Sequence, residues 1–160
     1  MKRLSVRLER CTGCQRCEIG CMAEHAPGQD YYTARAAAAA AKAPAPITRI
    51  LVESGGDGRA VPLVCRHCHE ALCVSACMSG CMQKDPKTGI VTNMGHEQQC
   101  VGCWMCIMAC PYGVITPSQD VAVIGGSPFA QAIKCDFCPQ RDTPACVEVC
   151  PNNAIEVLDD

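Results

Sequence analysis

The feature that most constrains this chain is its cysteines, which number 17 in 160 residues and gather in four groups. Each group contains four cysteines, and three residues separate the third from the fourth. The groups are Cys11, Cys14, Cys17 and Cys21; Cys65, Cys68, Cys73 and Cys77; Cys100, Cys103, Cys106 and Cys110; and Cys135, Cys138, Cys146 and Cys150. Cys81 is left over. A repeat of this kind predicts several copies of one structural unit.

Such a cysteine-rich chain is stabilised either by disulfides or by metal. Only 4% of its residues are aromatic, so a conventional aromatic core is not available. The N-terminal stretch MKRLSVRLERC has no apolar segment typical of a signal peptide and no twin-arginine stretch. We therefore expect a cytoplasmic protein, in which thiols stay reduced. An odd number of cysteines also argues against a disulfide framework, so metal binding is predicted.

The charged residues exclude some classes of partner. The chain has 14 basic and 16 acidic residues, a formal net charge of −2, and no block of Lys and Arg. Nucleic-acid binding is therefore not expected. No apolar run approaches the roughly 20 residues of a membrane span, so none is expected.

The spacing of the cysteines indicates which metal group they bind. The first and third groups have the pattern C-x2-C-x2-C-x3-C, whereas zinc sites usually pair two separate C-x2-C turns. The full run is typical of bacterial [4Fe–4S] proteins, where the fourth cysteine binds the other cluster of a pair. Sixteen cysteines predict four [4Fe–4S] clusters. Spacing alone leaves open whether neighbouring groups pair or whether the first group pairs with the last.

The segments between the groups predict an α+β fold of short strands and short helices. Strands are expected at 4–8, 88–93, 121–124 and 154–159, and a hairpin is expected over 47–64. A single helical turn suits the three residues between the third and fourth cysteines. The alanine-rich segment 34–46 favours helix until its prolines, and it is interpreted as an insertion.

The stretches CRHCHEALCVSAC, CVGCWMCIMACPYGVI and KCDFCPQRDTPACVEVCPNNAI give the chain a family resemblance. They resemble the four-cluster electron-transfer subunits of the DMSO reductase type, which also serve formate dehydrogenases, hydrogenases and CO dehydrogenases. The resemblance implies two nested ferredoxin-like dicluster units. The outer unit would comprise 1–33 and 118–160, and the inserted unit 47–117, with 34–46 as the insertion.

The resemblance also implies how the cysteines are shared among clusters. The four sets would be Cys11, Cys14, Cys17 and Cys150 (cluster 1); Cys65, Cys68, Cys73 and Cys110 (cluster 2); Cys100, Cys103, Cys106 and Cys77 (cluster 3); and Cys135, Cys138, Cys146 and Cys21 (cluster 4). Met22 and Met78 follow the fourth cysteine where the family usually has proline. Cys81 lies four residues after Cys77 and is predicted to be a buried packing residue rather than a ligand.

The implied function is electron transfer without catalysis. The residues of these motifs most resemble those of a subgroup that accompanies a tungsten aldehyde oxidoreductase or a CO dehydrogenase, together with a flavin-dependent NAD(P) oxidoreductase. Such a subunit relays single electrons between a catalytic and a flavin subunit. Self-association of the chain into a longer row of clusters, called a longer wire below, is a further expectation. The alternative is a free, diffusible polyferredoxin, against which the nearly balanced charge argues.

Other residues in the motifs suit structural roles. His67 and His69 flank Cys68, and because sixteen cysteines already suffice, they are expected to form hydrogen bonds or lie at the surface rather than bind iron. Trp104, Met105 and Met108 are expected to cover a cluster and exclude water from it.

Overall fold

The computed structural model describes residues 1–40, 47–56, 58–118 and 130–159. The chain divides into two compact units, each built from separate stretches of sequence. Unit 1 comprises Met1–Leu4, Cys65–Asp136 and Leu158–Asp160, and unit 2 comprises Ser5–Val64 and Phe137–Val157. Each unit therefore contains cysteines from two or more of the four groups.

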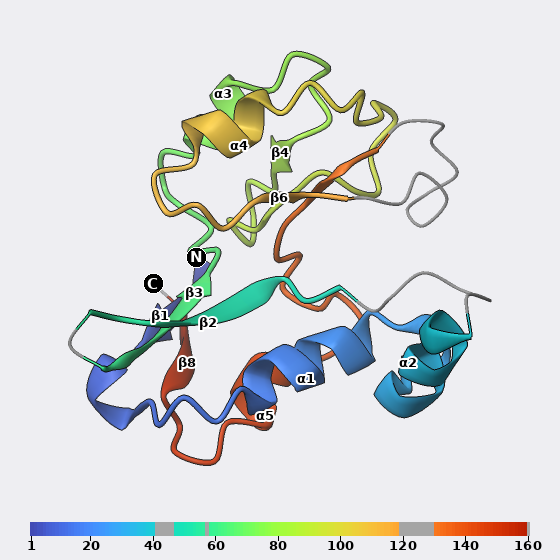
Figure 1. Ribbon diagram of the computed structural model, residues 1–160. Helices are drawn as coiled ribbons and strands as arrows, with labels where there is room; N and C mark the ends of the chain where they lie inside the picture. Colours follow the sequence, from blue (N-terminus) through green and yellow to red (C-terminus); the bar gives the residue numbers. More distant parts are fainter. Residues whose placement is uncertain (41–46, 57, 119–129, 160) are drawn as a thin grey trace. The chain divides into compact units, whose positions relative to one another are not determined.

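Unit 2 is organised around helix α1 (Arg16–Glu24), which packs against the short helix α5 (Ala145–Glu148) and against strand β2 (Ile50–Ser54) (Figure 1). Gly20 allows the two helices to approach closely, because an added Cβ would lie 2.9 Å from a methyl carbon of Val149. The packing of α1 on α5 brings the first cysteine group beside the last.

The remaining elements of unit 2 are short. Strand β2 pairs antiparallel with β3 (Ala60–Val64), from Ile50 opposite Val64 to Ser54 opposite Ala60. The hairpin predicted over 47–64 is thus present. Its turn closes with the Gly55 N–H donating to the Arg59 carbonyl at 2.7 Å. The 3₁₀ helices η1 (Leu8–Arg10) and η2 (Pro27–Gln29) and helix α2 (Tyr31–Ala39) complete the unit.

Unit 1 contains helices α3 (Leu72–Ser75) and α4 (Met105–Ala109), which pack on each other. It also contains two short antiparallel pairs, β4 (Gln83–Lys84) with β5 (Val91–Thr92) and β6 (Thr116–Pro117) with β7 (Ala132–Ile133). Its buried core combines aliphatic residues with cysteines: Cys81, Met82, Val91, Cys100, Cys106, Ile115 and Ala132. Cysteines thus take core positions that apolar side chains fill in other folds.

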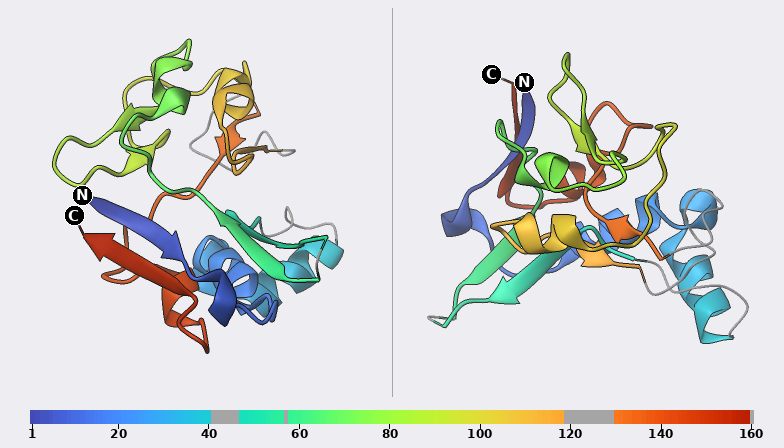
Figure 2. Two further views of the ribbon diagram at one scale, coloured as in Figure 1. Left: turned by 90° about the vertical axis from the view of Figure 1, so that its left-hand side faces the viewer. Right: turned by 90° about the horizontal axis from the view of Figure 1, so that it is seen from above.

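The two ends of the chain are held by one further pair of strands. Strand β1 (Lys2–Val6) lies beside β8 (Ile155–Asp159), as Figure 2 shows. Arg7 forms an ion pair with Glu156 at 2.6 Å just beyond the end of β1. This pair contributes residues to both units.

The predicted α+β class is confirmed, and so is a helical turn at the third cysteine of each group. The strand expected at 121–124 and the last part of the alanine-rich segment, 41–46, lie outside the described residues; residues 34–39 belong to α2. No helix in the described ranges is long and apolar enough to cross a membrane.

The compact units divide the chain at different places from the boundaries expected at 33, 46 and 117. Residues 47–64, expected in the inserted unit, group with unit 2. The reason is that β2 is bound to α1: the Val52 N–H donates to Glu18 Oε1 at 2.6 Å, and the Arg49 N–H donates to Cys21 Sγ at 3.2 Å. The nested domain organisation itself stays a prediction.

Candidate metal-binding sites

A left-handed backbone residue precedes the second cysteine of every group. These residues are Gly13, His67, Gly102 and Phe137, with φ of 69°, 47°, 68° and 68°. A positive φ reverses the chain within the two-residue gap, and glycine adopts it without steric cost. In the second and fourth groups a larger residue takes this conformation, which the surrounding structure must enforce.

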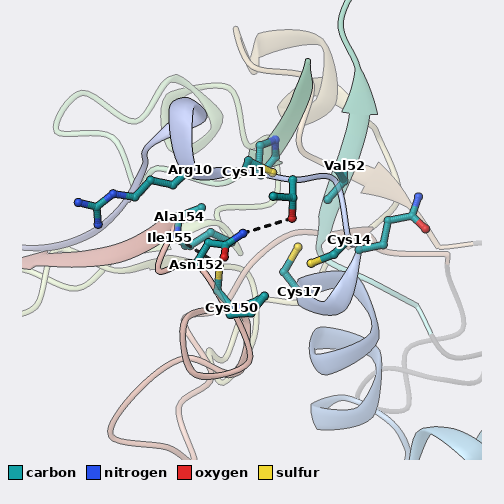
Figure 3. A pocket seen from close by; sticks show the side chains of 13 residues that line it. Arg10, Cys11, Cys14, Cys17, Val52, Cys150, Asn152, Ala154 and Ile155 are labelled. Atoms are coloured by element: carbon teal, nitrogen blue, oxygen red, sulfur yellow. Dashed lines mark hydrogen bonds between the residues drawn. The ribbon is translucent and has the colours of Figure 1, made fainter. Parts of the chain in front are cut away.

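The first pocket lies in unit 2 and is lined by the thiols of Cys11, Cys14, Cys17 and Cys150 (Figure 3). Three of these come from the first group, on the loop and start of α1, and the fourth follows α5. Asn152 Nδ2 donates to Thr12 Oγ1 at 3.3 Å, which ties the chain after Cys150 to the loop of the first group. Burial raises the pKa of Cys17 to about 11; the charges of Glu18 and Cys14 add to this rise, and the backbone N–H of Glu18 opposes it.

The second pocket lies in unit 1 and is lined by Cys65, Cys68, Cys73 and Cys110. Again three cysteines come from one group and the fourth from another. Burial raises the pKa of Cys73, and the nearby thiols of the same pocket raise it further.

His67 stabilises the loop of the second pocket. It is 4% exposed, and its Nδ1 accepts a hydrogen bond from the Val91 N–H at 3.0 Å. Burial, with a smaller contribution from the charge of Lys134, lowers the pKa of His67 to about 3. The ring is therefore neutral, and its contact with Val91 holds the left-handed turn before Cys68, in agreement with the expected hydrogen-bonding role.

A third group of thiols surrounds Cys106 in unit 1. Burial raises the pKa of Cys106 to about 11, followed by the effects of Cys100, Cys77, Cys103 and Cys73. Cys81 also lies here, with its Sγ 3.6 Å from that of Cys77. Burial raises its pKa to about 12.

The fourth group of thiols surrounds Cys146 in unit 2. Burial raises the pKa of Cys146, and Cys21, Cys138 and Cys17 raise it further. Cys21 of the first group therefore lies near cysteines of the last group. Cys135 is placed in unit 1, in the stretch that ends at Asp136.

The sulfur of the fourth cysteine accepts a backbone hydrogen bond in three groups. Cys21 accepts from Arg49 at 3.2 Å, Cys77 from Met82 at 3.4 Å and Cys150 from Ala154 at 3.2 Å. Burial alone would raise the pKa of Cys77, but the hydrogen bonds from Met82, Ser79 and Cys81 outweigh it and leave the pKa below its ordinary value. These bonds favour a thiolate at Cys77.

The chemistry of these donor sets fits a large cationic metal group. All seventeen cysteines lie in the described ranges, and none forms a disulfide. Burial disfavours the charged thiolate, and neighbouring thiolates repel one another, so both effects raise the pKa values of Cys17, Cys73, Cys106 and Cys146; a bound cation removes that penalty. Each of the two pockets is lined by four cysteines, which outnumber the histidine and carboxylate side chains in the same lining. A set of four thiols suits a [4Fe–4S] cluster.

Some functional residues were not identified from the sequence. The contacts of Arg49 with Cys21 and of Cys81 with Cys77 depend on tertiary structure, so spacing gives no signal for the first and only a weak one for the second. The role of His67 had a readable signal: it occupies the position in CRHC that glycine occupies in CTGC and CVGC.

Comparison with known proteins gives matches over most of the chain. The family described as 4Fe-4S dicluster domain matches residues 57–160. The chain is 36% identical to an iron-sulfur protein of Rhodospirillum rubrum, over 94% of this chain and 78% of that one. It is 33% identical to electron transport protein HydN of Escherichia coli K12, over 94% of this chain and 83% of that one.

Two further comparisons differ in kind. The putative oxidoreductase UacF of Escherichia coli K12 is 31% identical over 99% of this chain, which corresponds to 21% of that longer protein. Among solved structures, a chain of the active site complex BamBC of benzoyl coenzyme A reductase aligns with a TM-score of 0.46 and 20% identity, over 99% of this chain and 76% of that one.

Proposed function

Since this chain belongs to the 4Fe-4S dicluster family of electron-transfer proteins, we propose that it carries four [4Fe–4S] clusters and relays single electrons between two other subunits of an oxidoreductase. The family establishes the iron–sulfur cofactor. The number of clusters, their ligands and the relay are the proposal.

The proposed ligand sets share one rule, which is that three cysteines come from one group and the fourth from another. They are Cys11, Cys14, Cys17 and Cys150; Cys65, Cys68, Cys73 and Cys110; Cys100, Cys103, Cys106 and Cys77; and Cys135, Cys138, Cys146 and Cys21. Cys81 is not a ligand in this proposal.

The observation that carries the proposal is the pair of pockets. Each is lined by four cysteines, and in each the fourth cysteine comes from another group. The thiols around Cys106 include the other three members of its proposed set, and those around Cys146 include Cys21 and Cys138. Neighbour pairing of the first group with the second would require Cys77, not Cys150, beside Cys11.

When bound, each cluster accepts and releases one electron. The chain's own residues set the conditions for this. Buried thiols and apolar neighbours such as Ile115 exclude water, and the N–H groups of Met82, Ala154 and Arg49 direct positive dipoles at the ligand sulfurs. Both effects determine a cluster's reduction potential.

The proposed partners are a catalytic subunit and a flavin-dependent NAD(P) oxidoreductase. The residues of the cysteine motifs favour a tungsten aldehyde oxidoreductase or a CO dehydrogenase as the catalytic partner. A formate dehydrogenase or a hydrogenase is the alternative. Support comes from UacF, a putative oxidoreductase in which a segment similar to this chain forms about a fifth. No catalytic role is proposed for this chain. Free thiols in such number favour a cytoplasmic location.

The test is a pair of matched variants purified without oxygen. The unmodified chain should contain about sixteen iron atoms, four for each of four clusters. Cys150→Ser should damage the cluster of Cys11, Cys14 and Cys17, whereas Cys110→Ser should damage that of Cys65, Cys68 and Cys73. Iron content of about eight, or stoichiometric zinc, would contradict the four-cluster proposal.

The relay itself needs a second measurement. Native purification should recover the chain with a flavin subunit and a metal-dependent oxidoreductase. An active, stable monomer alone in cell extract would instead support the diffusible polyferredoxin, and stacks of the chain would support the longer wire.

A further inference from the structure

The residue after the fourth cysteine divides the groups into two kinds. Met22 and Met78 follow it in the first and second groups, whereas Pro111 and Pro151 follow it in the third and fourth. Proline ends a helix and redirects the chain, while methionine does neither. The residue four positions after each fourth cysteine differs in the same way: His25 and Cys81 in the first two groups, Val114 and Ala154 in the last two.

At Cys77, this fourth residue supplies a side-chain donor. The Cys81 Sγ lies 3.6 Å from the Cys77 Sγ, within the range of a sulfur hydrogen bond. Helix α3 has already ended at Ser75, so the contact needs no continuing helix. Instead, Gly80 takes a left-handed conformation with φ of 71° and returns the chain towards Cys77. Cys81 is 2% exposed, so water does not compete for its proton.

At Cys21, the corresponding residue is a histidine. Helix α1 runs past Cys21 to Glu24, and His25 follows directly. The His25 Nδ1 lies 2.8 Å from the Cys21 carbonyl oxygen and 3.7 Å from the Cys21 Sγ. The Nδ1–H donates to the carbonyl oxygen, which fixes the ring, and the longer contact makes the sulfur the second acceptor of a three-centre hydrogen bond.

The proline-containing groups lack such a donor at this position. The side chains of Val114 and Ala154 are buried and apolar. Cys150 accepts only the backbone N–H of Ala154 among the hydrogen bonds described for its sulfur. The methionine positions therefore coincide with a side-chain donor, and the proline positions with an aliphatic side chain.

We propose that Cys81 is a positioning residue whose S–H donates a hydrogen bond to the ligand sulfur of Cys77 and raises the reduction potential of the cluster held there, and that His25 acts in the same way on Cys21. The inference rests on the ligand sets proposed above. Hydrogen bonds to a ligand sulfur stabilise the more negative, reduced state. One electron is gained on reduction, and the proton stays on Cys81.

The experiment uses the full chain with its clusters, and it measures midpoint potentials by redox titration followed by electron paramagnetic resonance. Cys81→Ala places at this position the residue that the fourth group has in the corresponding position, Ala154, and so removes the side-chain donor. It should keep the full iron content and shift one of the four potentials to a more negative value. Cys81→Ser retains a donor of shorter reach and should shift the same potential less. His25→Ala should shift a different potential, and the double variant should show both shifts.

The outcomes separate this inference from the proposed function. Full iron content with all four potentials unchanged in Cys81→Ala would mean that Cys81 only packs, and the inference would fail while the electron-transfer function stands. Loss of one cluster in Cys81→Ala but not in Cys77→Ala would make Cys81 the ligand and overturn both. If the alanine variant does not fold, Cys81→Val decides, because it fills the space of the thiol without a donor, and four unchanged potentials in it would also refute the inference.

Discussion

The contact between Gly20 on α1 and Val149 at the end of α5 gives a sharp prediction about how the first and last cysteine groups are held together. In an isolated helix, Gly20→Ala would stabilise by about 1 kcal/mol, because alanine has the higher helix propensity. In this structure, however, the added Cβ would lie 2.9 and 3.2 Å from the two methyl carbons of Val149. Overpacking of this kind costs roughly 1–3 kcal/mol.

The steric cost exceeds the gain in propensity, so Gly20→Ala should destabilise the folded chain by about 1 kcal/mol net. Unfolding of a cluster protein releases iron irreversibly, so the rate of loss of cluster absorbance in denaturant is the suitable measurement. A change of this size in stability corresponds to roughly a fivefold change in that rate if the contact is broken at the transition state.

Two further variants make the test specific. Gly56→Ala lies in a hairpin turn with no atom within 4 Å of the added Cβ, so its rate should stay close to that of the unmodified chain. Val149→Ala removes both methyl groups, and in that background Gly20→Ala should slow the loss of absorbance. If Gly20→Ala slows it in the unmodified chain, α1 does not pack on α5 as described, and the reasoning is wrong.

Three other predictions concern the loops and the cofactor. Gly102→Ala should lose the cluster of Cys100, Cys103 and Cys106, because φ is 68° and the added Cβ would lie 2.7 Å from the Ala130 carbonyl oxygen. The control Gly95→Ala, with φ of 78° and open space around the added Cβ, should keep the full iron content. Equal iron losses in the two variants would refute the steric argument. Glu18→Ala should destabilise the folded chain by about 1–2 kcal/mol, because the Val52 N–H loses its acceptor, whereas Glu18→Gln keeps an acceptor oxygen. The rates at which the two variants lose cluster absorbance in denaturant would distinguish them. Chelation of iron should abolish most of the circular dichroism, since cluster binding supplies much of the folding free energy, and a native-like spectrum of the apoprotein would disprove this.

The repeat of the cysteines was sufficient to predict much of the site from the sequence. The x3 gaps predicted helical turns, which α1, α3, α4 and α5 provide, and the glycines within the x2 gaps, Gly13 and Gly102, take the left-handed conformation. Both are local consequences of spacing, so one sequence reveals them.

Features that depend on distant contacts were not predictable in this way. The grouping of the β2–β3 hairpin with unit 2 depends on Glu18 and Cys21 receiving N–H groups from residues about thirty positions later. The position of Cys81 beside Cys77 depends on a left-handed turn at Gly80 rather than on a helix. In both cases a backbone or side-chain donor finds a sulfur or carboxylate acceptor, which hydrophobic pattern and cysteine spacing do not encode.

The pocket shared by Cys11, Cys14, Cys17 and Cys150 has a consequence for synthesis of the chain on the ribosome. Its first three thiols emerge well before its fourth, because 133 positions separate Cys17 from Cys150 (150 − 17). Domains fold as their residues emerge, from the N-terminus onward. The thiols of residues 65–110 can assemble into their own pocket before residue 150 is synthesised, whereas Cys11, Cys14 and Cys17 lack the fourth cysteine of their pocket until then. Under the proposed ligand sets, the site of unit 2 is therefore completed later than the pocket of residues 65–110, and Cys11, Cys14 and Cys17 are the thiols most in need of protection from oxidants and competing metals during synthesis.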